Sequence, residues 1–103
     1  MIARVWRGAT RAEDGEAYTA YVEESGTGPA RKLPGSRGTL VLRRTRGDRT
    51  EFETIILFDS LDDVRAFAGD ELEAARFFPE DDRYLVDREL TARHFEVDAQ
   101  VPS

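Results

Sequence analysis

The sequence predicts an α+β fold of the ferredoxin-like type, with the element order β-α-β-β-α-β. The first observation is a change of hydrophobic period: residues 51–58 alternate as a strand does, whereas the apolar residues of 61–68 recur at helical spacing. The second observation is a hairpin signal, Gly47-Asp48, between two strand-like segments. Together they predict one antiparallel sheet that packs against a layer of helices.

The first half of the chain supplies one strand and one helix. We expect the first strand over Ile2–Arg7, almost at the first residue of the sequence. A helix should follow over 12–25, because apolar side chains recur there at helical spacing and acidic residues gather at its start, where the helix dipole favours them. The glycines and proline at 26–29 are expected to end this helix.

The hairpin predicts a register for the next two strands, over 38–46 and 51–58. If Gly47 and Asp48 are the loop residues, Arg44 faces Glu51 and Leu42 faces Glu53. After the second helix, a short turn or helix with an acidic start is expected from Pro79 through Leu85. Its carboxylates at 80–82 are interpreted as favourable charges at a helix start, in preference to metal ligands. The last strand is predicted over 88–97.

The ferredoxin-like plan orders these strands 4-1-3-2 and places both helices on one face. We expect the helix face to carry Ala3, Val5, Val41, Phe52, Ile56, Phe58, Phe95 and Val97. The opposite face is expected to carry Ile2, Arg4, Trp6, Leu40, Leu42, Arg44, Glu53, Ile55, Leu57 and His94. This second set is too apolar to remain in water, so we expect a second copy of the sheet to cover it and the protein to be a homodimer.

Composition limits the class of protein. The chain has 103 residues and is 40% hydrophobic, which fits one domain over 1–98 with a tail over 99–103. It has no cysteine and no long apolar run, so we expect a cytoplasmic protein without a membrane segment. The net charge of −6 argues against binding to nucleic acid, which requires a positive surface.

Five stretches spread over the chain carry a family resemblance: residues 2–8, the turn at 34–35, the strand-to-helix join at 58–67, and the stretches 78–85 and 94–97. Together they resemble the antibiotic biosynthesis monooxygenase family. The resemblance implies a dimeric α+β barrel in which two ferredoxin-like sheets face each other. It also implies an oxygenase function: some members oxidise electron-rich phenols or anthrones without a metal or flavin, and others degrade haem.

The chain departs from the haem-degrading pattern of that family, which uses an Asn, a Trp and a His. It contains no asparagine, and Phe67 and Arg76 stand where the resemblance would place the Trp and the His. Haem degradation is therefore not expected. No cofactor or metal is expected either, because there is no glycine fingerprint, cysteine cluster or metal-spaced histidine pair.

His94 is the only histidine, and its parity matches that of Arg4 and Trp6. An imidazole titrating near neutral pH can take a proton from a phenol or enol, and Arg4 can hold the resulting anion. Trp6 would form an apolar wall for a flat substrate, and Glu53 would orient the set. The alternative is that these residues form a satisfied polar cluster in a dimer interface.

Two functions follow from these patterns. The first is a cofactor-independent monooxygenase that oxidises a small aromatic or enolisable substrate with O2. The second is a non-catalytic small-molecule-binding or structural dimer with the same fold. The fold alone does not choose between them.

Overall fold

Strand β1 (Ile2–Arg11) is the centre of the sheet in the computed structural model, which describes residues 1–101. On one side it pairs with β3 (Arg49–Phe58), which in turn pairs with β2 (Ser36–Arg46). On its other side it pairs with two short strands, β4 (Leu85–Arg88) and β5 (Arg93–Glu96). If β4 and β5 are counted together as the fourth strand, this is the predicted 4-1-3-2 order. All pairings are antiparallel.

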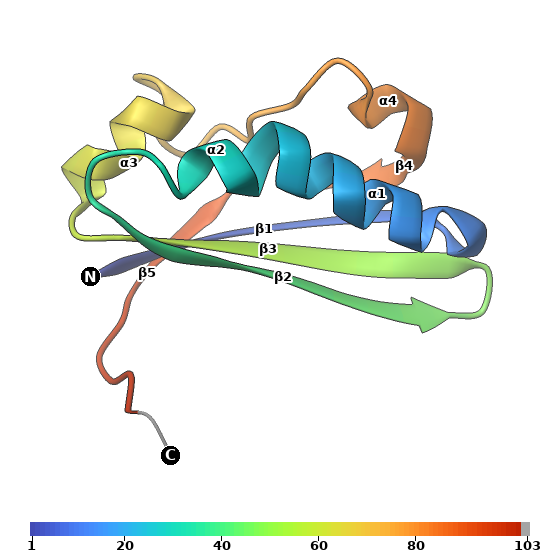
Figure 1. Ribbon diagram of the computed structural model, residues 1–103, viewed down its shortest axis with the longest axis horizontal. Helices are drawn as coiled ribbons and strands as arrows, with labels where there is room; N and C mark the ends of the chain where they lie inside the picture. The colour runs from blue at the N-terminus through green and yellow to red at the C-terminus, as the bar shows by residue number, and fades with distance from the viewer. Residues whose placement is uncertain (102–103) are drawn as a thin grey trace.

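The helices lie on one face of this sheet and leave the other face bare (Figure 1). A 3-10 turn, η1 (Ala12–Asp14), leads into α1 (Gly15–Val22), which continues through a π-helical turn, η2 (Glu23–Thr27), and ends in α2 (Gly28–Ala30). The second helical region consists of α3 (Leu61–Ala68) and the short α4 (Asp81–Tyr84). Between them, residues 69–80 form no helix and only one isolated bridge, Ala74 to Thr91; we call this segment the strap.

The first helical region is longer than predicted, because the glycines and proline at 26–29 do not end it. The chain widens into the π turn, in which the Gly28 N–H donates to the Glu23 carbonyl. A side chain could not fit at this turn: a Cβ on Gly28 would lie 2.3 Å from that oxygen. Proline interrupts the regular α-helical hydrogen bonds, and a π turn is one way to accommodate it.

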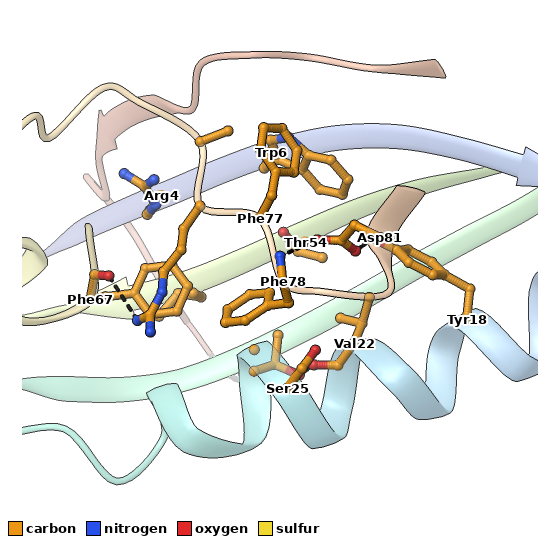
Figure 2. Close-up of a pocket in the computed structure, with 15 residues that line it drawn as sticks. Arg4, Trp6, Tyr18, Val22, Ser25, Thr54, Phe67, Phe77, Phe78 and Asp81 are labelled. Carbon is orange, nitrogen blue, oxygen red and sulfur yellow. Dashed lines mark hydrogen bonds between the residues drawn. The ribbon is translucent and has the colours of Figure 1, made fainter. Parts of the chain in front are cut away.

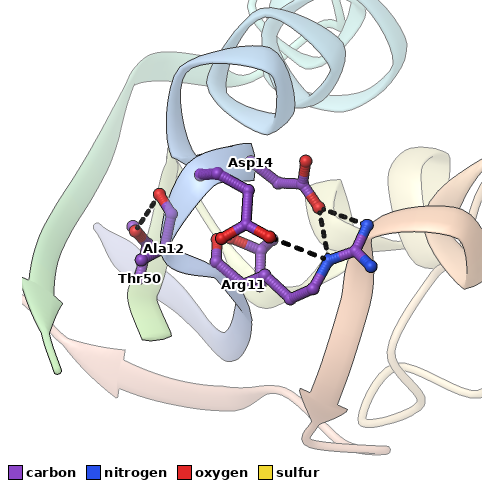
Figure 3. Close-up of polar contacts among 6 residues, drawn as sticks. Arg11, Ala12, Asp14 and Thr50 are labelled. Carbon is purple, nitrogen blue, oxygen red and sulfur yellow. Dashed lines mark hydrogen bonds and ion pairs between the residues drawn. The ribbon is translucent and has the colours of Figure 1, made fainter. Parts of the chain in front are cut away.

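The junction between β1 and the first helical turn is held by polar contacts (Figure 3). Arg11 donates from Nη2 to Asp14 Oδ2 at 3.0 Å, and its Nε lies 3.6 Å from Glu13. On the other side of the junction, the Thr50 hydroxyl of β3 donates to the Ala12 carbonyl at 3.3 Å. These contacts fix the start of the helix layer over the end of the sheet.

The hairpin register is confirmed. Arg44 faces Glu51 and Leu42 faces Glu53, and the Arg44 Nε donates to Glu51 Oε1 at 2.6 Å. β1 extends to Arg11, four residues beyond the predicted end. The single last strand predicted over 88–97 is instead β4 and β5. Residues between them leave the ladder because the Ala92 N–H donates to the Glu73 carbonyl of the strap at 2.8 Å.

The assignment of sides to β1 and to the last strand was wrong. In the β1–β3 register, Ile2 faces Phe58, Arg4 faces Ile56 and Trp6 faces Thr54. Because directly opposite residues point to the same side of a sheet, Arg4 and Trp6 lie on the helix-covered face. His94 joins them through its pairing with Arg4, whereas Phe95 and its partner Ala3 lie on the bare face. Small apolar residues in β1 had suggested the reverse.

The buried residues form two clusters between the sheet and the helices. One contains Tyr18, Val22, Phe52 and Leu85. The other contains Ala30, Ile56, Phe58 and Val64. The bare face carries the exposed apolar side chains of Leu40, Leu42 and Phe95, beside Ile55 and Leu57. None of the helices in residues 1–101 is both long and apolar enough to span a membrane.

Candidate functional site

A small cavity of about 50 Å³ lies between the sheet and the helix layer (Figure 2). Its floor is made by side chains of β1 and β3, including Arg4, Trp6 and Thr54. One wall comes from α1 and η2, and strap residues 75–78 form the opposite cover. The lining is mainly aromatic and apolar, with a few polar groups, which is the usual composition of a small-molecule site.

Arg4 is the unusual member of this lining. It is only 3% exposed, yet no salt bridge joins it to a carboxylate within residues 1–101. Its Nη1 donates to the Leu72 carbonyl at 2.5 Å and its Nη2 to the Ala74 carbonyl at 2.7 Å. Burial lowers the pKa of the Arg4 guanidinium to about 10. A buried cation without a counter-ion is costly, so this arginine marks a place where an anion would be favoured.

His94 contacts Arg4 and does not line the cavity. Its Nε2 lies 3.0 Å from Arg4 Nη1. A guanidinium has donors only, so Nε2 is the acceptor and the ring is neutral with its proton on Nδ1. Burial, followed by the charge of Arg4, lowers the pKa of His94, while Glu73 acts in the opposite direction. His94 therefore reaches the cavity only through Arg4.

Trp6 is held in place at three points. Its Nε1 donates to the Glu89 carbonyl at 2.8 Å, and its ring meets the edge of Phe77 at a centroid distance of 6.2 Å. The ring also lies over Gly8, where an added Cβ would be 2.5 Å from the Trp6 Cη2. The indole thus forms a fixed wall of the cavity, and its contact with a flat ligand stays a prediction.

The strap closes the cavity through Arg76 and two phenylalanines. The Arg76 guanidinium lies 5.3 Å from the ring centre of Phe67 and 5.0 Å from that of Phe78. Its Nη1 also donates to the Phe67 carbonyl at 3.0 Å, which ties the strap to the end of α3. Phe67 is shared, because the Arg4 guanidinium lies 5.6 Å from its ring centre. Such cation–π contacts favour the closed arrangement.

A buried acid lies in the cavity lining on the α1 side. Asp81 accepts a hydrogen bond from the Tyr18 hydroxyl at 2.9 Å and from the Phe78 N–H at 2.7 Å. Burial, together with the nearby Asp81, raises the pKa of Tyr18. Figure 2 shows Arg4 and Asp81 on opposite sides of Phe77 and Phe78. The cavity therefore has a cation towards one end and a hydrogen-bonded carboxylate towards the other.

Glu53 is not part of this group. It lies on the bare face of the sheet, where its Oε1 accepts from the Arg7 Nε at 3.0 Å. It lines a second, wider hollow of about 630 Å³ near the hairpin end, together with Arg44, Glu51 and other charged residues. The structure thus brings together Arg4, Trp6 and His94 and separates Glu53 from them.

The sequence alone did not indicate Tyr18, Phe77 and Phe78 as lining residues, and it predicted Asp81 only as a favourable charge at a helix start. Tyr18 was visible as part of the apolar stripe of the first helix, but nothing in the sequence indicated that its hydroxyl bonds to a residue 63 positions away. Phe77 and Phe78 belong to a segment without regular structure, so no periodicity gave their direction.

The cavity does not fit haem. Its volume of about 50 Å³ is far below the roughly 300–1,000 Å³ of ligand pockets. Its lining supplies no imidazole, thiolate or thioether as an axial ligand, and the hydroxyl of Tyr18 is already bonded to Asp81. Within residues 1–101 there is also no group of three or more His, Cys, Asp or Glu side chains that could hold a metal ion.

The structure is a ferredoxin-like α+β fold with a small cavity between its helices and its sheet. Solved structures identify the kind of protein that shares this fold. A Bacillus cereus protein assigned as an antibiotic biosynthesis monooxygenase superimposes with a TM-score of 0.64 at 14% identity, over 99% of this chain and 95% of that one. The resemblance predicted from the sequence is confirmed at the level of the fold.

The haem-degrading protein MhuD from Mycobacterium tuberculosis, with two haems in its active site, gives a TM-score of 0.60 at 16% identity, over 99% of this chain and 100% of that one. A mutant of MhuD with two manganese protoporphyrin IX molecules per active site gives 0.66 at 19% identity, with full coverage of both chains. No protein-family model matches the sequence. No curated protein sequence matches it.

Proposed function

We propose that this protein is a cofactor-independent monooxygenase that oxidises a small aromatic or enolisable substrate with O2. The observation that carries the proposal is Arg4, a cation buried without a carboxylate at an aromatic-lined cavity. Such a group stabilises the anion that forms when a phenol or enol loses its proton. The fold shared with oxygenases supports the same reaction class.

The reaction that fits this site begins with loss of a proton from the substrate. The electron-rich anion then reduces O2, one oxygen atom forms a new carbonyl on the substrate carbon, and the other leaves as water. The substrate carbon loses two hydrogens when it is the CH2 of an anthrone. For a phenol, the ring C–H and the O–H are lost. The balance is one substrate and one O2 giving one carbonyl product and one water.

His94 is the proposed base and Arg4 the proposed anion partner. In the closed site, Arg4 occupies the Nε2 lone pair of His94 and its charge helps to lower the pKa of that imidazole. An anion bound to Arg4 would offset this charge and raise the proton affinity of His94. Substrate binding would therefore prepare the base. Trp6 would form an apolar wall for the flat ring, with no role for Glu53.

We further propose that the protein is a homodimer whose bare sheet faces pack against each other. The apolar residues of this face, Leu40, Leu42, Ile55, Leu57 and Phe95, lie on three strands of one sheet. A contiguous apolar surface of this kind is unusual on a monomer. Because the cavity lies on the other face of the sheet, each copy would carry its own site.

The test is oxygen consumption with a panel of dihydroxynaphthalenes and anthrones, comparing wild type with His94→Gln. Glutamine can still accept the hydrogen bond from Arg4, but it cannot take up a proton. We expect turnover to fall by about a hundredfold or more, the usual worth of a positioned base, while folding is retained. Glu96→Gln, on the same face of β5, is the matched control and should leave turnover unchanged.

A second function remains a candidate because the site is closed. The guanidinium of Arg4 is bonded to two strap carbonyls and to His94. This closed arrangement would also suit a dimer that binds a small molecule and does not transform it. If no panel member consumes oxygen, or if His94→Gln oxidises the panel as wild type does, the catalytic proposal fails. Binding of the same compounds without turnover would then favour the second function.

A further inference from the structure

Arg4 presents its two terminal nitrogens to two separate oxygens of the strap. Nη1 donates to the Leu72 carbonyl at 2.5 Å, and Nη2 donates to the Ala74 carbonyl at 2.7 Å. One oxygen on each terminal nitrogen is also the arrangement that a carboxylate makes when it binds a guanidinium with both of its oxygens. The two carbonyls therefore occupy the positions that a two-oxygen anion would take.

The same strap limits the size of the cavity. About 50 Å³ holds only a few water molecules, and strap residues 75–78 cover the space. Besides the two bonds from Arg4, several hydrogen bonds tie the strap to the rest of the molecule, among them Arg65 Nη1 to Asp70 Oδ1 at 3.0 Å and the Glu80 N–H to the Tyr21 hydroxyl at 2.9 Å. Ala75 N–H donates to the Leu90 carbonyl at 2.9 Å, Ala92 N–H donates to the Glu73 carbonyl at 2.8 Å, and Arg76 bonds to Phe67. A ligand the size of an aromatic ring can enter only if the strap moves.

We propose that the site binds a flat aromatic anion that presents two oxygens to Arg4 in place of the carbonyl oxygens of Leu72 and Ala74, and that the strap moves aside to admit it. This inference rests on the proposed function, because it names the anionic group of that substrate. An aromatic carboxylate and the enolate of a dioxygenated ring share the required chemistry. A phenolate with a single oxygen would satisfy only one of the two nitrogens.

Charge explains why the exchange is favourable. The carbonyls offer Arg4 only dipoles, so its positive charge stays without a counter-ion. Hydrogen bonds between a cation and an anion are stronger than those between a cation and a neutral acceptor, and a planar anion matches the guanidinium fork. The released carbonyls can bond to water once the strap lifts. Trp6 and Phe67, which lie outside the strap, remain as apolar walls for the ring.

The first test compares two pairs of probes by titration calorimetry. Naphthoate is set against its neutral isostere naphthamide, and hydroxynaphthoquinone, which is an enolate at neutral pH, against naphthoquinone. We expect at least one anion to bind at least about tenfold more tightly than its neutral partner. Naphthoate should also change the fluorescence of Trp6, the single tryptophan. If neither anion is preferred over its neutral partner, or if nothing binds, the proposal is wrong. The two pairs distinguish a carboxylate from an enolate.

Variants locate the preference at Arg4. Arg4→Met should abolish the preference for the anion, and Arg4→Lys, which keeps the charge but lacks the fork, should reduce it. Arg37→Met removes an exposed arginine of β2 that pairs with Asp59, outside both the cavity and the strap, and should leave the preference unchanged. An unchanged preference in Arg4→Lys overturns the two-oxygen geometry. If Arg4→Met does not fold, the wild-type pairs and Arg4→Lys still decide the question.

A second measurement follows the strap itself by hydrogen exchange of residues 69–80. The preferred anion should speed exchange in this segment, because movement of the strap breaks the bond from the Ala75 N–H to the Leu90 carbonyl, and the neutral isostere should not. In Arg4→Met the strap should exchange quickly without any ligand. If the anion binds and strap exchange is unchanged or slowed, the ligand does not displace the carbonyls and the proposal is overturned.

Binding and strap exchange are measured without oxygen, so they do not depend on turnover. If the anion binds through Arg4 and the panel is never oxidised, the proposed function fails while the ligand class stands. If the panel is oxidised and neither two-oxygen anion is preferred, the ligand class fails while the function stands.

Discussion

Two arginines of β1, three positions apart, lie on opposite faces of the sheet and make different interactions. Arg7 is on the bare face, where its exposed side chain pairs with Glu53 at 3.0 Å. Arg4 is on the helix-covered face, buried, and bonded to backbone carbonyls and His94. Exposed ion pairs contribute little because water screens them, whereas a buried cation is sensitive to every partner. The same residue type is thus a surface pair in one place and a candidate anion site in the other.

The bare face and the helix-covered face of the sheet also differ in whether their charged groups are paired. The bare face has the larger hollow, about 630 Å³, but arginines and carboxylates line it, and several of them are already paired with each other. The covered face has only about 50 Å³, but its cation lacks a carboxylate. We therefore place the candidate site at the uncompensated buried charge of Arg4 and not at the larger hollow.

The largest expected effect concerns the bare face. The double substitution Leu40→Glu and Leu42→Glu places two carboxylates on its apolar surface. We expect the dimer dissociation constant to rise at least about a hundredfold, because each copy would bury unpaired charge. Analytical ultracentrifugation measures this, with Leu61→Glu as the control, since Leu61 is similarly exposed on α3. Wild type that sediments as a monomer at micromolar concentration would contradict the proposed interface.

The next effect separates the two arginines. Arg4→Met leaves the carbonyls of Leu72 and Ala74 without their donor, so we expect the free energy of unfolding to fall by about 2 kcal/mol. Arg7→Met removes an exposed ion pair and should change it by less than about 1 kcal/mol. Urea denaturation of both variants measures the difference. If both variants lose the same free energy of unfolding, the burial of Arg4 does not make its interactions more stabilising than those of Arg7.

The smallest effect is a pH dependence at His94, which faces Arg4 on β1 and Glu73 on the strap. Because the pKa of His94 is lowered in the folded state, the unfolded chain binds more protons near its ordinary pKa of about 6.5. The contribution of His94 to stability is therefore complete above that pH and is lost as the pH falls through the folded-state value.

Urea denaturation of wild type and His94→Gln between about pH 5 and pH 8 isolates this contribution, because the other titrating groups are common to both proteins. The free energy of unfolding of wild type should decrease relative to the variant as the pH falls. A relative increase on acidification would show that His94 gains protons more readily in the folded protein, contrary to the contacts with Arg4.

The fold was predictable because local signals agreed with the global plan. The change of period near Asp59 and the Gly47-Asp48 turn gave the element order and the β2–β3 register, and both are confirmed. Which face of the sheet each β1 side chain occupies was not predictable in the same way. No hairpin joins it to β3, so its parity was chosen from Ala3 and Val5, and burial of Arg4 among strap carbonyls reversed it.

The candidate site was predictable only in part. The shared parity of Arg4, Trp6 and His94 follows from strand geometry alone, and the structure brings Arg4 directly to His94 and to the cavity that Trp6 also lines. Glu53 was predicted to join this group because the side chains of Arg4 and Trp6 were assigned to the wrong face of the sheet. The strap could not be foreseen as the partner of Arg4, because its contacts are made by backbone carbonyls, which every sequence offers.

The π turn at Glu23–Thr27 sets the rotational phase of the helix that carries the cavity wall. Tyr18 and Val22 before it belong to one core cluster, and Ala30 after it belongs to the other, so both halves of the helix face the sheet. A π turn contains an extra residue compared with an α-helical turn. Because the wide turn takes up this extra residue, Ala30 keeps the orientation towards the sheet that it would have in a regular α-helix one residue shorter. The alignment of the two cores thus depends on the wide turn, which takes up one more residue without rotating the helix that follows it.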